Sequence, residues 1–259
     1  MARLPASDRA LLAANRRLEG RHAGSRCFVL GAGSSIAQQD LRKLGGEFVI
    51  SVSNTFVHPD YAFFRPRYHV VPSLIEGHGE VHTAEQFNAW LAVMAEATGR
   101  AEMFFHIGDR PLIEGTGLFR DRIVHWVNYA SWDGNFRTRL DLARVPSIWS
   151  VSELALTVAL VLGFEKIYLI GFDHDWFNGP LVYFYDHTRE HVMKPDADSL
   201  AFADSEFQMR RHAEMFRKYK YLQSLRKNVF NANANPRHYL DVFPTVGFDA
   251  LFPDSAPRT

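Results

Sequence analysis

The chain has 259 residues, 47% of them hydrophobic, and its 29 basic residues balance its 29 acidic ones. This length and composition suit one large globular domain with a substantial core, with or without a small insertion. The balanced charge argues against a nucleic-acid-binding protein, which usually carries a basic surplus. The single cysteine, Cys27, excludes an intramolecular disulfide framework and fits a reducing compartment, so we expect a cytoplasmic protein.

The first 24 residues predict a separate N-terminal helix. The stretch SDRALLAANRRLEG is polar and amphipathic, and we expect Ser7 to cap this helix and Gly20 to end it. Its basic face favours a solvated surface, with peripheral contact to an anionic membrane, at the inner face of the plasma membrane, as the alternative. No stretch of the chain reaches the roughly 18 consecutive apolar residues that span a bilayer.

Residues 25–259 predict a single α/β domain in which strands alternate with helices. We expect strands in apolar stretches at 26–30, 47–56, 68–76, 101–108, 166–171 and 228–232. We expect helices at 37–46, 83–99, 150–163, 204–227 and 248–252. Thr83 and either Ser150 or Ser152 are the expected N-caps, and Gly99 and Gly163 the expected helix ends. This alternation predicts a doubly wound, mostly parallel sheet of the Rossmann-like type.

Two regions lack the periodicity of helices and strands. Residues 108–146 hold aromatic and turn-forming residues, and we expect loops with one short strand there. Residues 177–203 are rich in aromatic residues, histidines and acids. A loop of that length inside a compact domain is usually functional, so we predict a lid at about 177–203.

Small and polar residues follow the predicted strands, at the sheet edge where ligands bind in this kind of fold. They are Gly31, Ala32, Gly33, Ser34, Ser35, Asn54, Pro72, Ser73, Gly171, Asp173, His174, Asp175 and Asn231. Glycines, hydroxyls, an amide and carboxylates at one edge suit the phosphates, ribose and base of a nucleotide. The sequence therefore predicts a nucleotide site at this edge.

The turn GAGSS, residues 31–35, has two interpretations. It would bring backbone N–H groups to a phosphate, or it would serve only as a tight turn between a strand and a helix. It is not a dinucleotide fingerprint, because Ile36 stands where the third glycine would be, and no GK[ST] follows as in a P-loop.

The stretch DHD contains two aspartates, Asp173 and Asp175, and permits three interpretations. The carboxylates would share a divalent cation such as Mg²⁺ that bridges a sugar-nucleotide diphosphate. They would instead hydrogen-bond substrate hydroxyls, or merely cap the next turn. We favour a site without a required cofactor and keep Mg²⁺ as the alternative.

The predicted lid supplies further candidates in the stretch YFYDHTREHV. A histidine there, His187 or His191, would act as general base on an acceptor hydroxyl, since imidazole titrates near neutral pH. The hydroxyls of Tyr183 and Tyr185 would steady a leaving phosphate. The alternative is a lid whose aromatic side chains only pack.

Several stretches resemble, in the same order, motifs of the bacterial sialyltransferases of glycosyltransferase family 42. They are FVLGAGSSI, SVSNTF, VVPS and SVSELALTVALVLGFEKIYLIGFDHDW. The chain is also similar to a wider group that includes the flagellar motility accessory glycosyltransferases and an archaeal pterin pyrophosphokinase. The resemblance runs from about Cys27 to Phe252 and is most specific from Ser150 to Asp173.

The resemblance implies a variant of the GT-A glycosyltransferase fold and a CMP-sugar donor. In the sialyltransferases the matching turn, strand ends and helix start contact CMP, which implies the contact residues Gly31, Gly33, Ser35, Asn54, Ser73 and Ser152. A lid tyrosine that holds the phosphate corresponds to Tyr183. From their position we add Ala32, Ser34, Gly171 and Asp175 to the nucleotide-binding candidates.

The chain departs from the sialyltransferase pattern at several motif positions. Ala32 and Val71 each replace an asparagine, Trp149 replaces an arginine, and Asp204 stands where the catalytic histidine lies. The chain is therefore more similar to the wider group than to a true sialyltransferase. Either Asp204 or a lid histidine replaces the base, or the chemistry differs.

These observations predict a glycosyltransferase of bacterial surface polysaccharide or lipopolysaccharide assembly. It would transfer a sugar, with CMP-linked acidic sugars favoured, from a nucleotide donor to a glycan acceptor, with His187, Asp204 and Asp173 as catalytic candidates. One alternative is an ATP- and Mg²⁺-dependent pyrophosphokinase, and another is a catalytically degenerate nucleotide-binding protein. A homo-oligomer is compatible with each of them.

Overall fold

The structure is a computed structural model that describes residues 4–74, 83–130, 140–174, 182–186, 205–234 and 241–253. A seven-stranded sheet has the order β5-β4-β3-β2-β1-β8-β9, and all its pairings are parallel. Its strands are β1 (Arg26–Leu30), β2 (Phe48–Val52), β3 (Tyr68–Val70), β4 (Glu102–His106), β5 (Val124–Val127), β8 (Lys166–Ile170) and β9 (Val229–Asn231). The predicted α/β fold with a doubly wound parallel sheet is confirmed.

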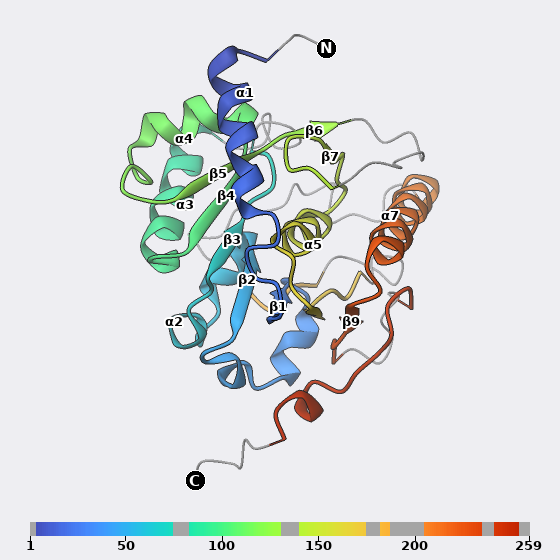
Figure 1. Ribbon diagram of the computed structural model, residues 1–259. Helices are drawn as coiled ribbons and strands as arrows, with labels where there is room; N and C mark the ends of the chain where they lie inside the picture. The colour runs from blue at the N-terminus through green and yellow to red at the C-terminus, as the bar shows by residue number, and fades with distance from the viewer. Residues whose placement is uncertain are drawn as a thin grey trace.

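Helices cover both faces of the sheet (Figure 1). One side carries α2 (Tyr61–Phe64), α3 (Ala84–Thr98) and α4 (Arg110–Thr116), and the other carries α5 (Val151–Leu162) and α7 (Ser205–Leu225). Two short strands, β6 (Tyr129–Ala130) and β7 (Val145–Pro146), pair separately from the main sheet. Among the described residues, no helix is long and apolar enough to cross a membrane.

The two cores follow from the alternation of side chains along buried strands. In β1, Cys27 and Val29 join the core under α5 and α7, whereas Phe28 and Leu30 join the core under α2 and α3. Cys27 is completely buried, and this burial raises the pKa of its thiol well above the usual range. An apolar run with no polar face is therefore what a central strand of this sheet requires.

The helix signals at residues 83–99 and 150–163 are confirmed. Thr83 caps α3 and Gly99 follows its last residue. The hydroxyl of Ser150, rather than that of Ser152, caps α5 by accepting from the backbone N–H of Ser152, and the Glu153 side chain bonds back to the N–H of Ser150. Every residue of α5 from Ser152 to Leu162 is buried, as the nearly all-apolar sequence predicts.

Three local expectations are wrong. The helix expected at 37–46 is replaced by two short 3₁₀ helices, η2 (Ser34–Gln38) and η3 (Leu41–Leu44), because the backbone extends at Gln39 and Asp40 caps a new turn. Residues 108–146 contain the expected short strand, β5, but also the unexpected helix α4 and the short strands β6 and β7. Ser7 lies inside α1 (Ala6–Ala13), whose N-cap is Pro5. By contrast, the short terminal helix expected at 248–252 is present as the 3₁₀ helix η7 (Asp249–Leu251).

The N-terminal segment packs on the edge of the domain. It consists of α1 and the 3₁₀ helix η1 (Ala14–Leu18). The amide of Asn15 donates to the carbonyl of Trp126 in β5 at 2.6 Å, and Asp8 pairs with Arg110 at 2.6 Å. Leu12 and Leu18 are buried. These contacts tie the segment to β5 and α4.

The topology places the candidate site. The order of strands along the chain reverses between β1 and β8, since β2 follows on one side and β9 on the other. In open parallel sheets, ligands bind outside the carboxyl ends of the strands at such a switch point. The turns after β1 and β8 therefore form the candidate site.

A buried carboxylate stabilises the opposite edge, where the strands begin. Glu102 is 2% exposed and pairs with Arg21 at 2.8 Å, Arg67 at 2.9 Å and His125 at 2.8 Å. Burial raises the pKa of this carboxyl, but hydrogen bonds from His125 and Arg21 outweigh it and lower the pKa to about 2. Glu102 is thus ionised in the folded protein and surrounded by donors.

We expect Glu102→Gln to lower stability at neutral pH, with a loss that shrinks as the pH falls. Because the folded-state pKa of Glu102 is about 2 and its ordinary value is 4.5, its contribution is present above pH 4.5 and disappears toward pH 2. Urea unfolding across this range measures the difference from wild type. Glu114→Gln, at an exposed i,i+4 pair with Arg110, is the control and should change little. Equal stability of Glu102→Gln and wild type at neutral pH would contradict the expectation.

Candidate functional site

The turns after β1 and β8 pack directly against each other. The backbone N–H of Gly33 donates to the carbonyl of Gly171 at 2.9 Å, and that of Gly31 donates to Ile170 at 2.8 Å. A Cβ atom on Gly33 would lie 2.5 Å from the carboxyl carbon of Asp173, and one on Gly31 would clash with the Gly171 carbonyl. These glycines are therefore required for the close approach of the two turns.

Asp173 joins three strand ends. Its carboxylate is 3% exposed and accepts hydrogen bonds from the Ser35 backbone at 2.9 Å, from the Ser35 hydroxyl and from the Asn233 amide at 2.6 Å. The carbonyl oxygen of the Asn233 side chain in turn accepts from the Gly171 backbone at 2.8 Å. The turns after β1, β8 and β9 thus share one network of buried hydrogen bonds.

This network bears on the interpretation of the DHD stretch. Both carboxylate oxygens of Asp173 face donors of the chain itself. Asp175 lies outside the described residues, so the predicted metal pair stays a prediction. In the described ranges, no group of three His, Cys, Asp or Glu side chains is arranged to hold a metal ion.

Two tyrosines lie over the turn of residues 31–35. Tyr183 forms an antiparallel bridge with Gly33, and the backbone N–H of Phe184 donates to the carbonyl of Ala32 at 3.3 Å. The rings of Tyr183 and Tyr185 stack with centroids 5.2 Å apart. Burial raises the pKa of both phenols, so both are neutral hydroxyl groups at physiological pH.

Asn54 connects this tyrosine pair to the end of β2. Its amide donates to the Tyr185 hydroxyl at 3.1 Å, and its side-chain carbonyl accepts from the indole N–H of Trp90 at 2.7 Å. Asn54 is 3% exposed, so these two bonds fix the orientation of its amide. Asn54, the residue just after β2, therefore uses its amide to hold the Tyr185 hydroxyl in place.

Ser73, after β3, contacts a carboxylate from the neighbouring strand end. Its hydroxyl donates to Asp109 at 3.3 Å, and the Leu74 backbone donates to the other oxygen of Asp109 at 2.9 Å. Asp109 ends the short helix η5 (Ile107–Asp109) after β4 and is completely buried. The predicted residue is present at the carboxyl edge, with an acidic neighbour that sequence analysis missed.

The start of α5 is joined to α7 by a buried ion pair. Glu153 accepts from the backbone of Trp149 at 2.6 Å, and its other oxygen lies 3.2 Å from the ammonium of Lys218. Both side chains are nearly inaccessible. Burial raises the pKa of Glu153, and the charge of Lys218 opposes this shift. Ser152 is also buried beside this pair.

Arg211 brings a positive charge to the same region. Its guanidinium donates to the carbonyl of Trp149 at 2.7 Å and lies 5.9 Å from the centroid of the Trp149 ring. Burial lowers the pKa of Arg211, and the neighbouring Tyr183 phenol and Glu153 carboxyl oppose this. A guanidinium keeps its charge in proteins, so a partly buried cation lies near Tyr183.

Two histidines near Arg211 are neutral. Burial, and then the charges of His212 and Arg211, lowers the pKa of His174 to about 3. Burial and Arg211 lower the pKa of His212 to about 4. His174 has a left-handed backbone, with φ of 46°, and its ring lies 3.0 Å from the Tyr219 hydroxyl. Imidazoles with such pKa values do not titrate near neutral pH.

The structure thus unites part of the predicted site. The turns after β1 and β8 and the tyrosine pair form one cluster, made up of Gly31, Ala32, Gly33, Ser34, Ser35, Gly171, Asp173, Tyr183, Tyr185 and Asn54. The hydrogen bonds described for Ser73 and Ser152 are to Asp109 and Ser150, not to this cluster. His187, His191 and Asp204 lie outside the described residues, as does the predicted lid apart from 182–186.

The sequence matches no protein-family model and no curated protein. The resemblance to the family 42 sialyltransferases therefore rests on the motifs quoted above and stays a prediction.

We expect Gly33→Ala to destabilise the protein by about 1–3 kcal/mol, because the new methyl group would meet the Asp173 carboxyl and the Gly171 carbonyl. Gly115→Ala in α4 is the matched control, since a Cβ there meets nothing within 4 Å. That variant should gain about 0.5–1 kcal/mol from helix propensity. Denaturant unfolding of both proteins checks the pair. Similar effects of the two substitutions would show that the turns are not closely packed.

We expect Asp173→Asn to destabilise the protein by about 1–3 kcal/mol, because a side-chain NH₂ would then face the donors of Ser35 or Asn233. Asp249→Asn is the control, because Asp249 is 80% exposed in its pair with Lys43. It should change stability by less than about 0.5 kcal/mol. Unfolding curves for both variants test this, and an unchanged midpoint for Asp173→Asn would show that the carboxylate is not structural.

Proposed function

We propose that this protein is a glycosyltransferase that uses a nucleotide-activated sugar, with CMP-linked acidic sugars favoured, in the assembly of a bacterial surface glycan. The observation that carries the proposal is the stacked pair Tyr183 and Tyr185, which lies over the turn after β1 and is held by Asn54. This pair lies at the switch point of a parallel sheet, where nucleotides bind in such folds.

Two backbone N–H groups of the turn after β1 are already hydrogen-bonded within the chain, which supports a ligand with a single phosphate. The N–H groups of Gly33 and Ser35 bond to the β8 turn, so they do not cradle a polyphosphate as a P-loop does. The groups suited to hold a phosphate are instead phenolic hydroxyls, the Ser34 hydroxyl and the guanidinium of Arg211. Among the described residues, no hydrogen bond joins the Ser34 side chain to the chain. CMP-sugars carry one phosphate, which fits this limited set.

The proposed reaction is substitution at the anomeric carbon of the sugar. The bond from that carbon to the phosphate oxygen breaks, the acceptor hydroxyl oxygen forms the new bond, and a base takes its proton. Charge that develops on the departing phosphate would be stabilised by Arg211 and by neutral tyrosine hydroxyls. His187 and Asp204 remain the proposed bases, because His174 and His212 have pKa values of about 3 and about 4, too low for a base near neutral pH.

Asp173 has a different part in this proposal. Its three hydrogen bonds within the chain favour a role in positioning the turn of residues 31–35 over direct contact with substrate or metal. We therefore propose donor binding without a required metal ion. A Mg²⁺-dependent reaction of ATP would instead indicate the pyrophosphokinase alternative.

The test is calorimetric titration with CMP, and with ATP, each with and without Mg²⁺. We expect metal-independent CMP binding, weakened about 10-fold by Tyr185→Phe, because one partly buried hydroxyl and its hydrogen bond are lost. Tyr221→Phe is the matched control, since Tyr221 lies in the last turns of α7, which lead to the amino end of β9. If ATP binds only with Mg²⁺ and CMP does not bind, the protein is a phosphotransferase instead of a glycosyltransferase. Failure of every nucleotide to bind would end the proposal.

A further inference from the structure

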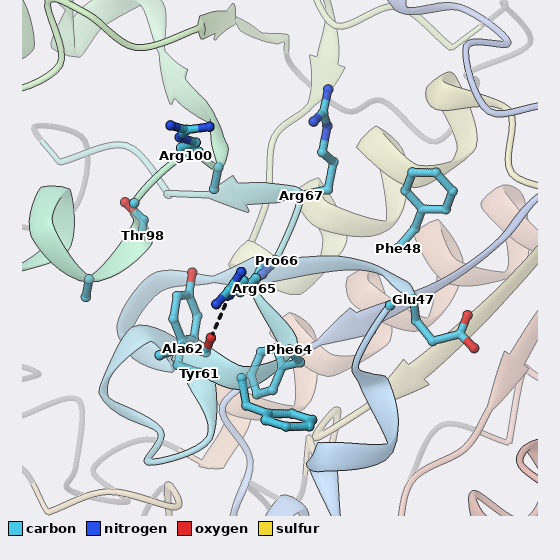
Figure 2. Close-up of a pocket in the computed structure, with 15 residues that line it drawn as sticks. Glu47, Phe48, Tyr61, Ala62, Phe64, Arg65, Pro66, Arg67, Thr98 and Arg100 are labelled. Carbon is cyan, nitrogen blue, oxygen red and sulfur yellow. Dashed lines mark hydrogen bonds between the residues drawn. The ribbon is translucent and has the colours of Figure 1, made fainter. Parts of the chain in front are cut away.

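A pocket with a volume of about 770 Å³ opens at the edge of the sheet opposite the candidate site (Figure 2). It is formed by the segments that lead into β2, β3 and β4, at residues 46–48, 61–67 and 97–101. The five residues of β2 separate the two edges by roughly 16 Å. This pocket is therefore distinct from the cluster around Asp173.

The charge of the pocket is positive. Three arginines line it, Arg65, Arg67 and Arg100, and Glu47 is the one acidic residue among the described lining residues. Glu47 is already paired with Arg26 at 2.5 Å. Arg67 is paired with Glu102, a carboxylate outside the lining that also pairs with Arg21 and His125. The arginines of the pocket therefore exceed the carboxylates available to neutralise them.

Arg65 is held in an unusual backbone conformation. It follows α2 with φ of 44° and ψ of 74°, in the left-handed region where helix ends usually carry glycine. Its guanidinium donates through Nε to the carbonyl of Ala62 at 3.2 Å, as the dashed line in Figure 2 marks. A bulky residue in this region is unfavourable, so Arg65 adopts a backbone conformation that would suit glycine better.

The wall beside the arginines is apolar and aromatic. Phe63 is 53% exposed, with the guanidinium of Arg42 lying 5.6 Å from its ring centroid. Phe48 and the buried Phe64 and Pro66 also line this wall. A ligand that matches both parts of the pocket carries an anionic group next to an apolar one.

We propose that this pocket binds the phosphate group of a ligand whose adjoining part is apolar. Arginine guanidinium groups match phosphate oxygens in geometry and charge, and three of them line the pocket: Arg65 and Arg67 from the segment before β3, and Arg100 from the turn before β4. Two sources share this chemistry: a soluble phosphate monoester with an apolar group, and a phospholipid headgroup at a membrane surface. The proposal does not depend on the function of the opposite edge.

The experiment uses the full chain and two probes. Phenyl phosphate is titrated calorimetrically, and phosphatidylcholine vesicles with and without phosphatidic acid are tested for co-sedimentation. The variant Arg65→Gln/Arg100→Gln should weaken phosphate binding at least about 10-fold, because each guanidinium contributes charged hydrogen bonds. Arg67 is left unchanged because it also pairs with Glu102. Binding should also weaken as salt is added.

The control variant Arg120→Gln/Arg144→Gln removes the same charge from exposed positions outside the pocket. It should bind both probes like wild type. Binding of phenyl phosphate that the pocket variant weakens assigns a soluble ligand, and binding only to vesicles with phosphatidic acid assigns a headgroup. Absence of binding to either probe, or equal losses in both double variants, overturns the proposal. If Tyr185→Phe weakens binding of phenyl phosphate and the pocket variant does not, the phosphate binds at the opposite edge and the proposal is overturned.

Discussion

The carboxylate of Asp173 accepts hydrogen bonds from Ser35 and Asn233, and so it holds together the turns that follow β1, β8 and β9. Glycines at positions 31, 33 and 171 let these turns approach without Cβ atoms between them. Tyr183 then lies on the turn after β1, and Tyr185 reaches Asn54 at the end of β2. The contacts between these turns thus meet at one buried carboxylate, while Asn54 is oriented by Tyr185 and Trp90.

Much of the fold could be predicted because its signals are local. Buried parallel strands need unbroken apolar runs, and the caps of α3 and α5 depend on residues within one helical turn. The failures also have local causes that propensity does not contain. Residues 37–46 have a helical composition, yet the chain extends at Gln39 between two short 3₁₀ helices. The helix α4 was missed because Arg110–Thr116 is short and contains a proline and a glycine.

The candidate site was only partly predictable. Sequence places Asp173 at a strand end, but it cannot say whether the partner of that carboxylate is a ligand or another turn, and here it is Ser35 and Asn233. Arg211 belongs to the amphipathic helix α7. The sequence of that helix does not show which of its cations faces α5 and which faces solvent. The pocket at the amino edge has no sequence motif, because Arg100 and part of the apolar lining lie far along the chain from Arg65 and Arg67.

The completely buried Cys27 in β1 has a practical consequence for studying this protein. It is the only cysteine, it lies in a strand paired on both sides, and its pKa is well above the usual range. A thiol reagent attacks the thiolate, so the folded chain is protected until β1 separates from β2 and β8. The rate of covalent labelling at this one thiol therefore reports the rate at which the central sheet opens.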